Sequence, residues 1–358
     1  MKPQPHIANM APYALADLST PEGKRLISLS QNESMRGPAP SVPAAVAQAV
    51  TASHAYPDPD WTDLRRVLAA RCCINPDMIL CGNGSLDLIG CLARAFLGDG
   101  DAALAPAHAY PFFRSATIMT GARFDKAPES NLEADVDTLL AGVTPETRIL
   151  FLANPGNPTG TRLPRIELLR LRQELSEDIL LILDEAYGEF SDYLGEPMFD
   201  LIDRGNTVLL RTFSKAYGLA GMRVGWGYFP PFIRDQVRKV MNPNNVSYLS
   251  QIAALAALND HDYMQATCTE TARVRDAFIS EMRDLGVSVL DSFTNFALLR
   301  FASTSQASNI DARLRAEGIF ARPQAGAGLP DCLRVTVADE GDMTKAAEMI
   351  RKAYLDAV

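Results

Sequence analysis

The feature that most constrains the fold is an alternation of short apolar segments with helical segments between residues 78 and 240. The helical segments repeat apolar residues at i, i+3 and i+4, as at Leu86, Ile89 and Ala93, which gives each helix one buried face. Strands that alternate with helices are typical of a parallel sheet covered on both faces. We therefore expect an α/β fold with strands at Met78–Cys81, Ala102–Leu104, Arg148–Ala153, Ile179–Leu183, Thr207–Arg211 and Val224–Phe229.

The pattern changes after Pro243. A long helical region, Ser247–Leu285, is expected to lead into a smaller α+β domain. Its strands are predicted at Val287–Leu290, Asn295–Phe301, Ile319–Arg322 and Leu333–Val337. The proline-rich segment 37–43 is predicted to be a connector, so that the residues before it pack on the C-terminal domain. We predict a large domain at 44–245 and a small domain made of 1–43 and 246–358, with an N-terminal arm.

Composition excludes several classes of function. The 358 residues include 34 basic and 43 acidic side chains, a net charge of -9, which disfavours a surface for nucleic acid or anionic membranes. No apolar run reaches the ~20 residues that a membrane helix needs, and the first residues lack the apolar core of a signal peptide. The six cysteines show no metal-ligand spacing and the four histidines are scattered, so we expect no metal and free thiols in a cytoplasmic protein.

Lys215 is the residue that most strongly indicates the chemistry of the functional site. It follows an apolar strand, lies between hydroxyl residues and precedes a glycine-rich turn, in Thr212-Phe213-Ser214-Lys215-Ala216-Tyr217-Gly218. A surface charge is poorly placed at such a point. A Schiff base between a lysine and an aldehyde cofactor, by contrast, needs a rigid strand end and nearby donors. Arg223, eight residues on, is the predicted cation for the cofactor's phosphate.

A second motif, Cys81-Gly82-Asn83-Gly84-Ser85, follows a predicted strand and opens a helix. Free N–H groups at a helix N-terminus, with glycines that permit close approach, suit a phosphate. An ordinary glycine turn is the alternative. Asp87 occupies the place of the third glycine in the dinucleotide fingerprint, so a single phosphate fits better than a dinucleotide.

Two polar residues also follow strands, where open α/β sheets bind ligands. Asn157, in Asn154-Pro155-Gly156-Asn157-Pro158, is either a turn residue or a donor to a ligand oxygen. Asp184 comes directly after Leu181-Ile182-Leu183 and is either a helix cap or the partner of a protonated pyridine nitrogen. With Lys215, Arg223 and the Gly84–Ser85 amides, these residues match each polar group of pyridoxal 5'-phosphate.

Through these motifs the chain resembles the fold-type I pyridoxal-phosphate aminotransferases, and among them the histidinol-phosphate aminotransferase family. The resemblance implies a large pyridoxal-phosphate-binding domain with a mostly parallel seven-stranded sheet between helices, as in aspartate aminotransferase, plus the smaller α+β domain. By the same resemblance, Lys215 binds the cofactor covalently and moves the proton, Asp184 binds the ring nitrogen, and Asn157 and Tyr187 bind the phenolic oxygen. The phosphate would be bound by Thr212, Ser214, Arg223 and the backbone of Gly84, Ser85 and Leu86.

The resemblance also predicts a homodimer. Tyr56, in Ala55-Tyr56-Pro57-Asp58, matches a family tyrosine that reaches the phosphate of the neighbouring subunit's cofactor; the alternative is an ordinary surface turn residue. In Tyr110-Pro111-Phe112-Phe113, counting back from Gly121 places Phe113, not Tyr110, over the cofactor ring, which leaves Tyr110 on the substrate side.

Substrate contacts follow from the family pattern as well. Arg334 matches an arginine that binds the substrate carboxylate by a bidentate fork, and Asn32 matches a segment that closes over the substrate. Arg322 matches an arginine that contacts the substrate's phosphate, with a surface salt bridge as the alternative, and Tyr13 matches a tyrosine that contacts it from the other subunit. The chain departs from the family after the Arg334 strand. Val337-Ala338-Asp339-Glu340-Gly341 replaces Gly-Thr-Arg-Glu-Glu, and a basic group is lost.

These observations predict a cytoplasmic aminotransferase of amino acid biosynthesis. It would move an amino group from an amino acid or histidinol phosphate to 2-oxoglutarate in a ping-pong cycle. An aromatic amino acid aminotransferase or a phosphothreonine-type decarboxylase on the same scaffold is the alternative. Acyl-transferring synthases of this fold are disfavoured because Ser214, not histidine, precedes the lysine. A regulatory module is disfavoured because no basic DNA-binding region precedes Tyr13.

Overall fold

The computed structural model describes residues 1–8, 10–12, 18–203 and 205–356. Within them, seven strands form the central sheet in the order β2-β8-β7-β6-β5-β3-β4. The sheet is parallel except for β8, which runs antiparallel to both neighbours. The predicted α/β class and the mostly parallel seven-stranded sheet are therefore confirmed. The strands are β2 Ile79–Gly82, β3 Ala102–Pro106, β4 Arg123–Ala127, β5 Thr147–Ala153, β6 Leu180–Asp184, β7 Thr207–Thr212 and β8 Gly225–Tyr228.

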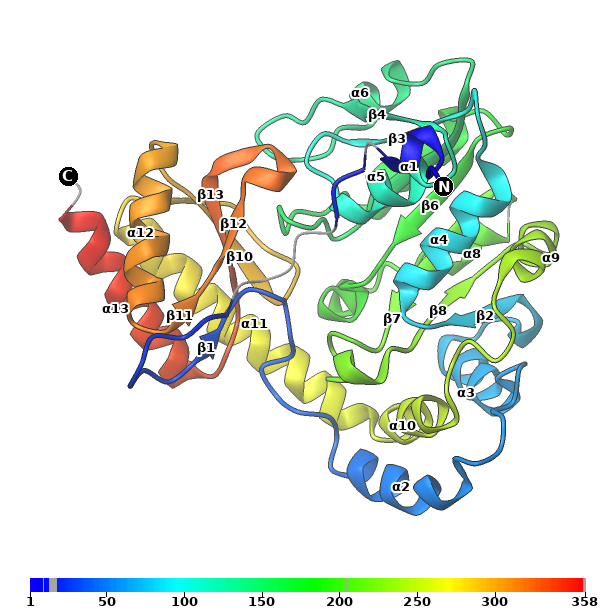
Figure 1. The fold of residues 1–358 in the computed structure, drawn as a ribbon, viewed down its shortest axis with the longest axis horizontal. Helices are drawn as coiled ribbons and strands as arrows, with labels where there is room; N and C mark the ends of the chain where they lie inside the picture. Colours follow the sequence, from blue (N-terminus) through cyan, green and yellow to red (C-terminus); the bar gives the residue numbers. More distant parts are fainter. Residues whose placement is uncertain (9, 13–17, 204, 357–358) are drawn as a thin grey trace.

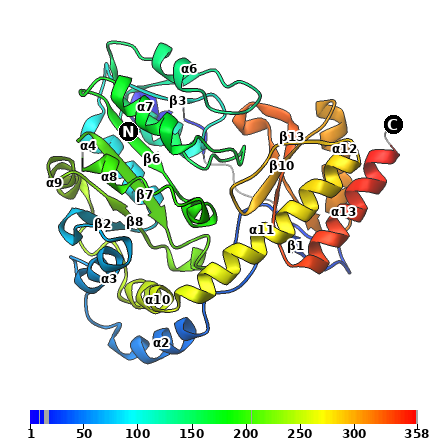
Figure 2. The ribbon, with the colours of Figure 1, turned by 180° about the vertical axis from the view of Figure 1, so that it is seen from behind.

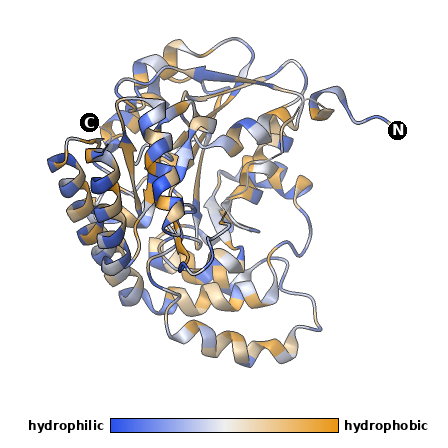
Figure 3. Ribbon diagram, turned by 60° about the vertical axis from the view of Figure 1, so that its left-hand side comes forward, coloured by the Kyte–Doolittle hydropathy of each residue, from blue (hydrophilic) through white to orange (hydrophobic). Residues whose placement is uncertain are grey.

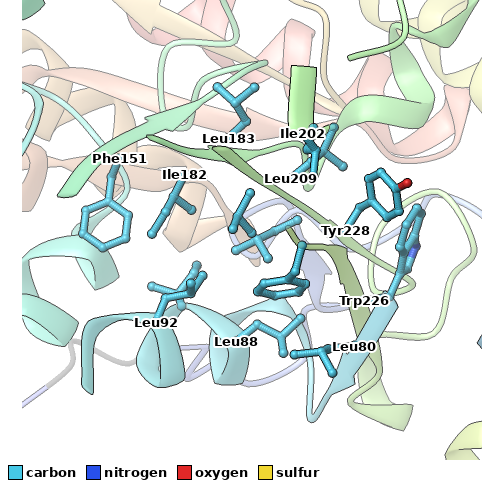
Figure 4. Close-up of a cluster of buried hydrophobic side chains, with 14 of the residues drawn as sticks. Leu80, Leu88, Leu92, Phe151, Ile182, Leu183, Ile202, Leu209, Trp226 and Tyr228 are labelled. Atoms are coloured by element: carbon cyan, nitrogen blue, oxygen red, sulfur yellow. The ribbon is translucent and has the colours of Figure 1, made fainter. Parts of the chain in front are cut away.

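Helices cover both faces of this sheet, as the alternating pattern predicts. Helices α4 and α5 lie on the face turned to the viewer in Figure 1, and α7 and α8 lie on the other face in Figure 2. Leu88 and Leu92 on α4 point toward the strands, where they meet Ile182 and Leu209 (Figure 4). All four side chains are fully buried, which is why the strands read as continuous apolar runs. The helices of this part are α2 Ser41–Ala49, α3 Thr62–Cys72, α4 Ser85–Phe96, α5 Pro111–Ile118, α6 Val136–Ala141, α7 Arg165–Glu174, α8 Phe199–Ile202, α9 Pro231–Val240 and α10 Tyr248–Asn259.

The C-terminal part has its own sheet and its own core. Four strands pair in the order β12-β13-β10-β9, all antiparallel. The long helix α11 runs between the two parts of the molecule (Figure 2). A separate cluster of buried apolar residues fills the space among this sheet and α11, α12 and α13. The elements are α11 His261–Asp284, β9 Ser288–Val289, β10 Phe296–Arg300, α12 Thr304–Ala316, β11 Ile319–Phe320, β12 Arg322–Gln324, β13 Leu329–Thr336 and α13 Glu340–Leu355.

The N-terminal segment packs on the C-terminal part. The short strand β1, Ile27–Ser28, pairs in parallel with β11, with Ile27 opposite Ile319. Ile27 and Leu29 belong to the C-terminal core. These contacts attach the segment around β1 to the C-terminal part, and the division into 44–245 and 1–43 with 246–358 stays a prediction. The first residues, before helix α1 (Pro5–Ala8), extend away from the body in Figure 3, and they are exposed.

The structure differs from the expected elements, or refines them, in three places. The edge strand β4 was not predicted, because its sequence Arg-Phe-Asp-Lys-Ala carries charges that an exposed edge tolerates. The expected helical region Ser247–Leu285 consists of two helices, which are separated at Asp260. The expected strand Ile319–Arg322 is divided, because Ile319 pairs with β1 whereas Arg322 pairs with β13.

In the part of the chain that is described, no helix is both long and apolar enough to cross a membrane. Those residues also contain no group of three or more His, Cys, Asp or Glu side chains that could hold a metal ion. The remaining single-turn 3-10 helices are η1 Val50–Ala52, η2 Pro76–Met78, η3 Gly188–Phe190, η4 Asp192–Leu194, η5 Ala220–Met222 and η6 Ala325–Ala327.

Candidate active site

A cavity of about 310 Å³ lies at the carboxyl ends of the central strands. Asp184 ends β6 and Thr212 ends β7, while Lys215 follows three residues later. The opposite wall comes from the C-terminal sheet, through Arg322 on β12 and Arg334 on β13. The predicted site residues that line this cavity are Asn32, Ser85, Leu86, Tyr110, Asn157, Asp184, Tyr187, Thr212, Ser214, Lys215, Arg223, Arg322 and Arg334.

Lys215 points its amine at the cavity and at the N-terminal segment. Its Nζ donates to the carbonyl oxygens of Gln31 at 3.2 Å and Asn32 at 2.9 Å. Burial, together with the positive charge of Arg334, lowers the pKa of Lys215 to about 7. A substantial fraction of the amine is therefore neutral at neutral pH, which is the form that attacks a carbonyl carbon.

Asp184 is a buried carboxyl group in the same cavity. Its Oδ1 accepts a hydrogen bond from the backbone nitrogen of Ala186 at 3.1 Å. Burial raises the pKa of Asp184 to about 7, although that hydrogen bond opposes the change. A buried carboxylate is costly without a cationic partner. A protonated ring nitrogen bound in the cavity would supply that partner.

Strand β2 and helix α4 meet strand β8 in a crowded turn. Gly84 has φ +80°, and a Cβ on it would lie 2.5 Å from Nη2 of Arg223. A Cβ on Gly225 would lie 2.3 Å from the backbone nitrogen of Ser85. No side chain caps the start of α4 at Gly84, so its first N–H groups are not satisfied by a cap. The backbone there is open to a small anion.

Hydroxyl and guanidinium groups complete this turn. Thr212 Oγ1 lies 3.0 Å from Ser214 Oγ, and Arg223 Nη1 lies 3.4 Å from the same oxygen. Backbone N–H groups, two hydroxyls and one guanidinium together form the donor set that a phosphate monoester requires. The sequence-predicted phosphate residues thus come together at one end of the cavity.

Tyr187 receives two side-chain amides. Asn32 Nδ2 donates to the Tyr187 hydroxyl at 2.7 Å, and Asn157 Nδ2 does so at 3.4 Å. Arg334 lies beside this group: Nη1 donates to Asn157 Oδ1 at 2.6 Å, and Nη2 donates to the carbonyl of Ser30 at 2.7 Å. The Arg334 guanidinium is thus held at the cavity wall by two neutral acceptors, the Asn157 side chain and the Ser30 carbonyl.

The prediction that Phe113 lies over the cofactor ring is wrong. Phe113 is fully buried, and its ring stacks on Phe151 with 4.7 Å between centroids. Tyr110 lines the cavity instead. The reason is local: α5 begins at Pro111, so Tyr110 precedes the helix while Phe113 falls on its inward face. An aromatic wall for a ring is therefore available from Tyr110.

Of the predicted site residues that the structure describes, Tyr56 lies apart from the cavity. Tyr56 is 89% exposed and does not line it. Tyr13 lies outside the described residues. Gly84 itself is not among the lining residues, although its neighbours Ser85 and Leu86 are.

Sequence reasoning missed three residues that support the site. Ser30 provides the carbonyl that accepts from Arg334, and Asn295 Nδ2 donates to the carbonyls of Asn32 and Glu33 at 3.2 and 2.9 Å. Thr336 Oγ1 bonds to Asn32. Thr336 could have been found, because it stands two residues after Arg334 on one strand and so shares its face. The other two carried no local signal.

The donor set fits pyridoxal 5'-phosphate. Its phosphate matches the turn at Ser85, Ser214 and Arg223, whose Gly84 leaves no room for a side chain. Asp184 suits the ring nitrogen, because a protonated pyridine offsets the cost of a buried carboxylate. Lys215 offers an amine with a lowered pKa to the aldehyde.

Comparison with known proteins agrees with this geometry. The family model described as aminotransferase class I and II matches residues 24–350. The chain is similar to the histidinol-phosphate aminotransferase of Paramagnetospirillum magneticum, with 40% identity over 353 residues that cover 96% of this chain and 97% of that protein.

Solved structures show the same likeness. The histidinol-phosphate aminotransferase of Sinorhizobium meliloti in complex with pyridoxal 5'-phosphate superposes with a TM-score of 0.93 and 32% identity, covering 99% of this chain and 98% of that chain. Aspartate aminotransferase from Thermus thermophilus with maleate shares the fold, with a TM-score of 0.78, 20% identity, and coverage of 93% and 92%.

Proposed function

This chain belongs to the class I and II aminotransferases and depends on pyridoxal 5'-phosphate, and we propose that it transfers an amino group from histidinol phosphate to 2-oxoglutarate. The single observation that carries the proposal is the cavity in which Lys215, Asp184 and the Ser214–Arg223 turn meet. Neither the aromatic aminotransferase nor the decarboxylase alternative is favoured by the relatives reported above.

When bound, pyridoxal phosphate supplies an aldehyde that bonds to amines and a ring that accepts the electron pair released from the neighbouring carbon. In our proposal, Lys215 holds it covalently and then carries the proton, since a pKa near 7 lets the amine both release and accept one at neutral pH. Asp184 stays ionised against the ring nitrogen and keeps it protonated. Asn157 and Tyr187 hold the phenolic oxygen, while Tyr110 covers the ring face.

Arg334 is proposed to orient the α-carboxylate of 2-oxoglutarate and of the glutamate formed from it. Its guanidinium already lies in the cavity wall with its fork held by Asn157 and Ser30. A carboxylate that approaches it exchanges a neutral partner for a charged one, which strengthens the contact. Asn32, in the segment over Lys215, closes the same side of the cavity.

A second chamber supports a phosphorylated donor. This chamber, of about 520 Å³, shares Tyr110 and Arg322 with the catalytic cavity, so the two are adjacent. Four basic residues, Arg114, Lys126, Arg315 and Arg322, line it, and Arg315 is also paired with Asp311 at 2.7 Å. In a chain of net charge -9, this gathering of basic side chains supports the binding of an anion. We assign the donor's phosphate to this chamber, near Arg322.

We also propose a cytoplasmic homodimer. Tyr56 is exposed on the isolated chain although it is a large aromatic residue, as expected if it enters a neighbouring site. The segment before α1 extends away from the body, where it can contact a second subunit (Figure 3). The cysteines of the chain are free thiols, which suits a reducing compartment.

The test is a panel of amino donors with the purified holoenzyme and 2-oxoglutarate. Histidinol phosphate, phenylalanine and phosphothreonine are compared by formation of glutamate and of carbon dioxide. We expect kcat/KM to be highest for histidinol phosphate, with no carbon dioxide from any donor. A preference for phenylalanine would reassign the donor, and release of carbon dioxide from phosphothreonine would refute the reaction type.

A further inference from the structure

We infer that His108 is a positioning residue for donor specificity: its side chain holds the η6 wall of the second chamber against the segment that carries Tyr110, so that this chamber fits the donor's phosphate. His108 lies between β3 and α5, two residues before Tyr110. It lines neither the catalytic cavity nor the second chamber, although its neighbours Ala107 and Ala109 line the chamber. The inference rests on the proposed function, because the second chamber is the place to which we assign the donor's phosphate.

The second chamber is built from two parts of the molecule. One wall comes from residues 106–111, which follow strand β3 of the central sheet. The opposite wall comes from residues 321–327, which belong to the C-terminal part. Each part has a buried core of its own. The width of the chamber therefore depends on the contacts that join the two parts.

The His108 ring makes one such contact. Its Nδ1 lies 2.8 Å from the carbonyl oxygen of Ala327, the last residue of η6. A carbonyl oxygen can only accept a hydrogen bond, so Nδ1 carries the hydrogen and donates it. The same nitrogen lies 3.6 Å from the position of a Cβ placed on Gly328, so the ring packs directly against this turn. Ala327 is buried, which limits the access of water to the bond.

The backbone of His108 is fixed from its other side. Its N–H donates to Oε1 of Glu129 at 2.9 Å, in the loop that follows β4. The next nitrogen along the chain, that of Ala109, donates to the carbonyl of Pro106 at 3.1 Å and closes a turn. These two bonds hold the segment that leads to Tyr110. The bond from the His108 ring therefore sets the place of η6 relative to Tyr110.

The carboxylate end of the catalytic cavity has joining contacts of its own. Arg334 Nη1 donates to Asn157 Oδ1 at 2.6 Å, and the backbone nitrogen of Phe293 donates to the carbonyl of Gly160 at 2.8 Å. These bonds join the C-terminal part to the loop of Asn157, where the α-carboxylate is proposed to bind. Loss of the His108 bond should therefore affect the second chamber more than the carboxylate end.

The effect on a donor follows from the population of the joined arrangement. A phosphate binds when the two walls of the second chamber have the separation seen here. If a variant adopts that arrangement only part of the time, its apparent affinity for the phosphorylated donor falls by the same fraction. One hydrogen bond of ordinary strength corresponds to a change of about three- to tenfold. A donor without a phosphate does not occupy this chamber, so its affinity should not change.

The experiment measures the half-reaction of the holoenzyme with histidinol phosphate, histidinol and glutamate, each over a range of concentrations. His108→Leu removes the N–H and keeps a side chain of similar size. We expect the half-saturating concentration of histidinol phosphate to rise about three- to tenfold, with an unchanged maximal rate. The values for histidinol and glutamate should stay at the wild-type level. The dissociation constant of histidinol phosphate for the borohydride-reduced holoenzyme, in which no amino group is transferred, should rise by the same factor.

His108→Asn tests the hydrogen bond itself. The asparagine side chain places an N–H at the same number of bonds from the backbone as Nδ1 of histidine, but it cannot carry a positive charge. It should therefore restore the wild-type half-saturating concentration of histidinol phosphate. If His108→Leu does not fold, His108→Ala replaces it in the same measurements.

The matched control is Thr271→Val. Thr271 is buried, and its hydroxyl donates to the carbonyl of Thr267 at 2.7 Å within α11. This variant also loses a bond from a side chain to a backbone carbonyl, but the bond lies within one helix. It should lower the melting temperature without changing the response to any of the three donors.

The outcomes separate this inference from the proposed function. An enzyme that prefers histidinol phosphate to histidinol, and keeps that preference in His108→Leu, would overturn the role of His108 and leave the proposed function intact. Equal losses for all three donors would overturn it too, because they would indicate a general effect on the fold. Failure of His108→Asn to restore the affinity would overturn the role of the hydrogen bond. A wild-type enzyme without preference for histidinol phosphate over histidinol would refute the proposed donor and the inference together.

Discussion

At the scale of single residues, the cavity holds two ionisable groups whose pKa values are displaced toward each other. Burial raises the pKa of Asp184 to about 7 and lowers that of Lys215 to about 7. In the cofactor-free protein, burial therefore disfavours the carboxylate form of Asp184 and the ammonium form of Lys215. A bound cofactor offsets both, since its ring nitrogen pairs with the carboxylate and its aldehyde takes up the amine.

This account predicts that Asp184→Asn stabilises the cofactor-free protein in a pH-dependent way. The pKa of Asp184 is raised above its ordinary value of 3.8, so a proton is bound more tightly in the folded state. The favourable contribution is present at low pH and is lost as pH rises through about 7. The amide variant carries no such loss.

We therefore expect the melting temperature of cofactor-free Asp184→Asn to exceed the wild-type value at pH 8, by an amount that reflects a few kcal/mol. Near pH 5 the difference should be much smaller. Thermal unfolding at the two pH values measures it. A variant that is equally or less stable than wild type at pH 8 would contradict the assigned cost of this carboxylate. The same substitution should remove most transaminase activity.

At the scale of elements, the junction of β2 with α4 sets the phosphate end of the cavity. We predict that Gly84→Ala weakens binding of pyridoxal phosphate roughly tenfold or more, since a Cβ there meets Arg223 Nη2 at 2.5 Å. Titration of the cofactor-free protein with pyridoxal phosphate measures this.

Gly100→Ala is the control for backbone strain. Gly100 also has a positive φ, +88°, but nothing lies within 4 Å of a Cβ placed on it. It should cost stability, about 1 kcal/mol, without changing the affinity for the cofactor. Equal losses of affinity in the two variants would show that the Arg223 contact does not matter.

The same scale shows what sequence could and could not predict. Strands buried on both faces, such as β6, are apolar throughout, and a polar residue at their carboxyl end stands out, which is how Asp184 was found. Edge strand β4 has no such contrast, because one side of it meets solvent. The choice between Tyr110 and Phe113 depended on the residue at which α5 begins, and a shift of a few residues turns a side chain from the cavity to the core.

Long-range contacts were the other limit. The conformation of Asn32 is fixed by Thr336 and Asn295, which lie some 300 and 260 residues away in the sequence. No sequence pattern near Asn32 predicts these contacts. The tertiary structure brings β13 beside the segment that follows β1. The motifs of the central sheet could be predicted because each is local to one strand end, whereas the cavity wall opposite them is assembled from distant segments.

At the scale of the whole molecule, the proposed dimer can be tested by complementation. If Tyr56 serves the neighbouring site, the Tyr56→Ala and Lys215→Ala substitutions fall in the same site of a mixed dimer. One site then keeps both residues and the other loses both. Mixing the two weakly active proteins, with exchange of subunits, should restore roughly a quarter of wild-type activity. No recovery despite demonstrated exchange would mean that Tyr56 acts within its own subunit or not at all.

The most direct test of the central claim, that Lys215 is the amine that holds pyridoxal phosphate in the cavity it shares with Asp184, is borohydride reduction of the holoenzyme followed by peptide mass spectrometry. Reduction makes the covalent link permanent, so the labelled peptide identifies the lysine. We predict that the pyridoxyl phosphate label lies on Lys215 and is absent in Lys215→Ala. A label on another lysine, or retention of the label in that variant, would contradict the account.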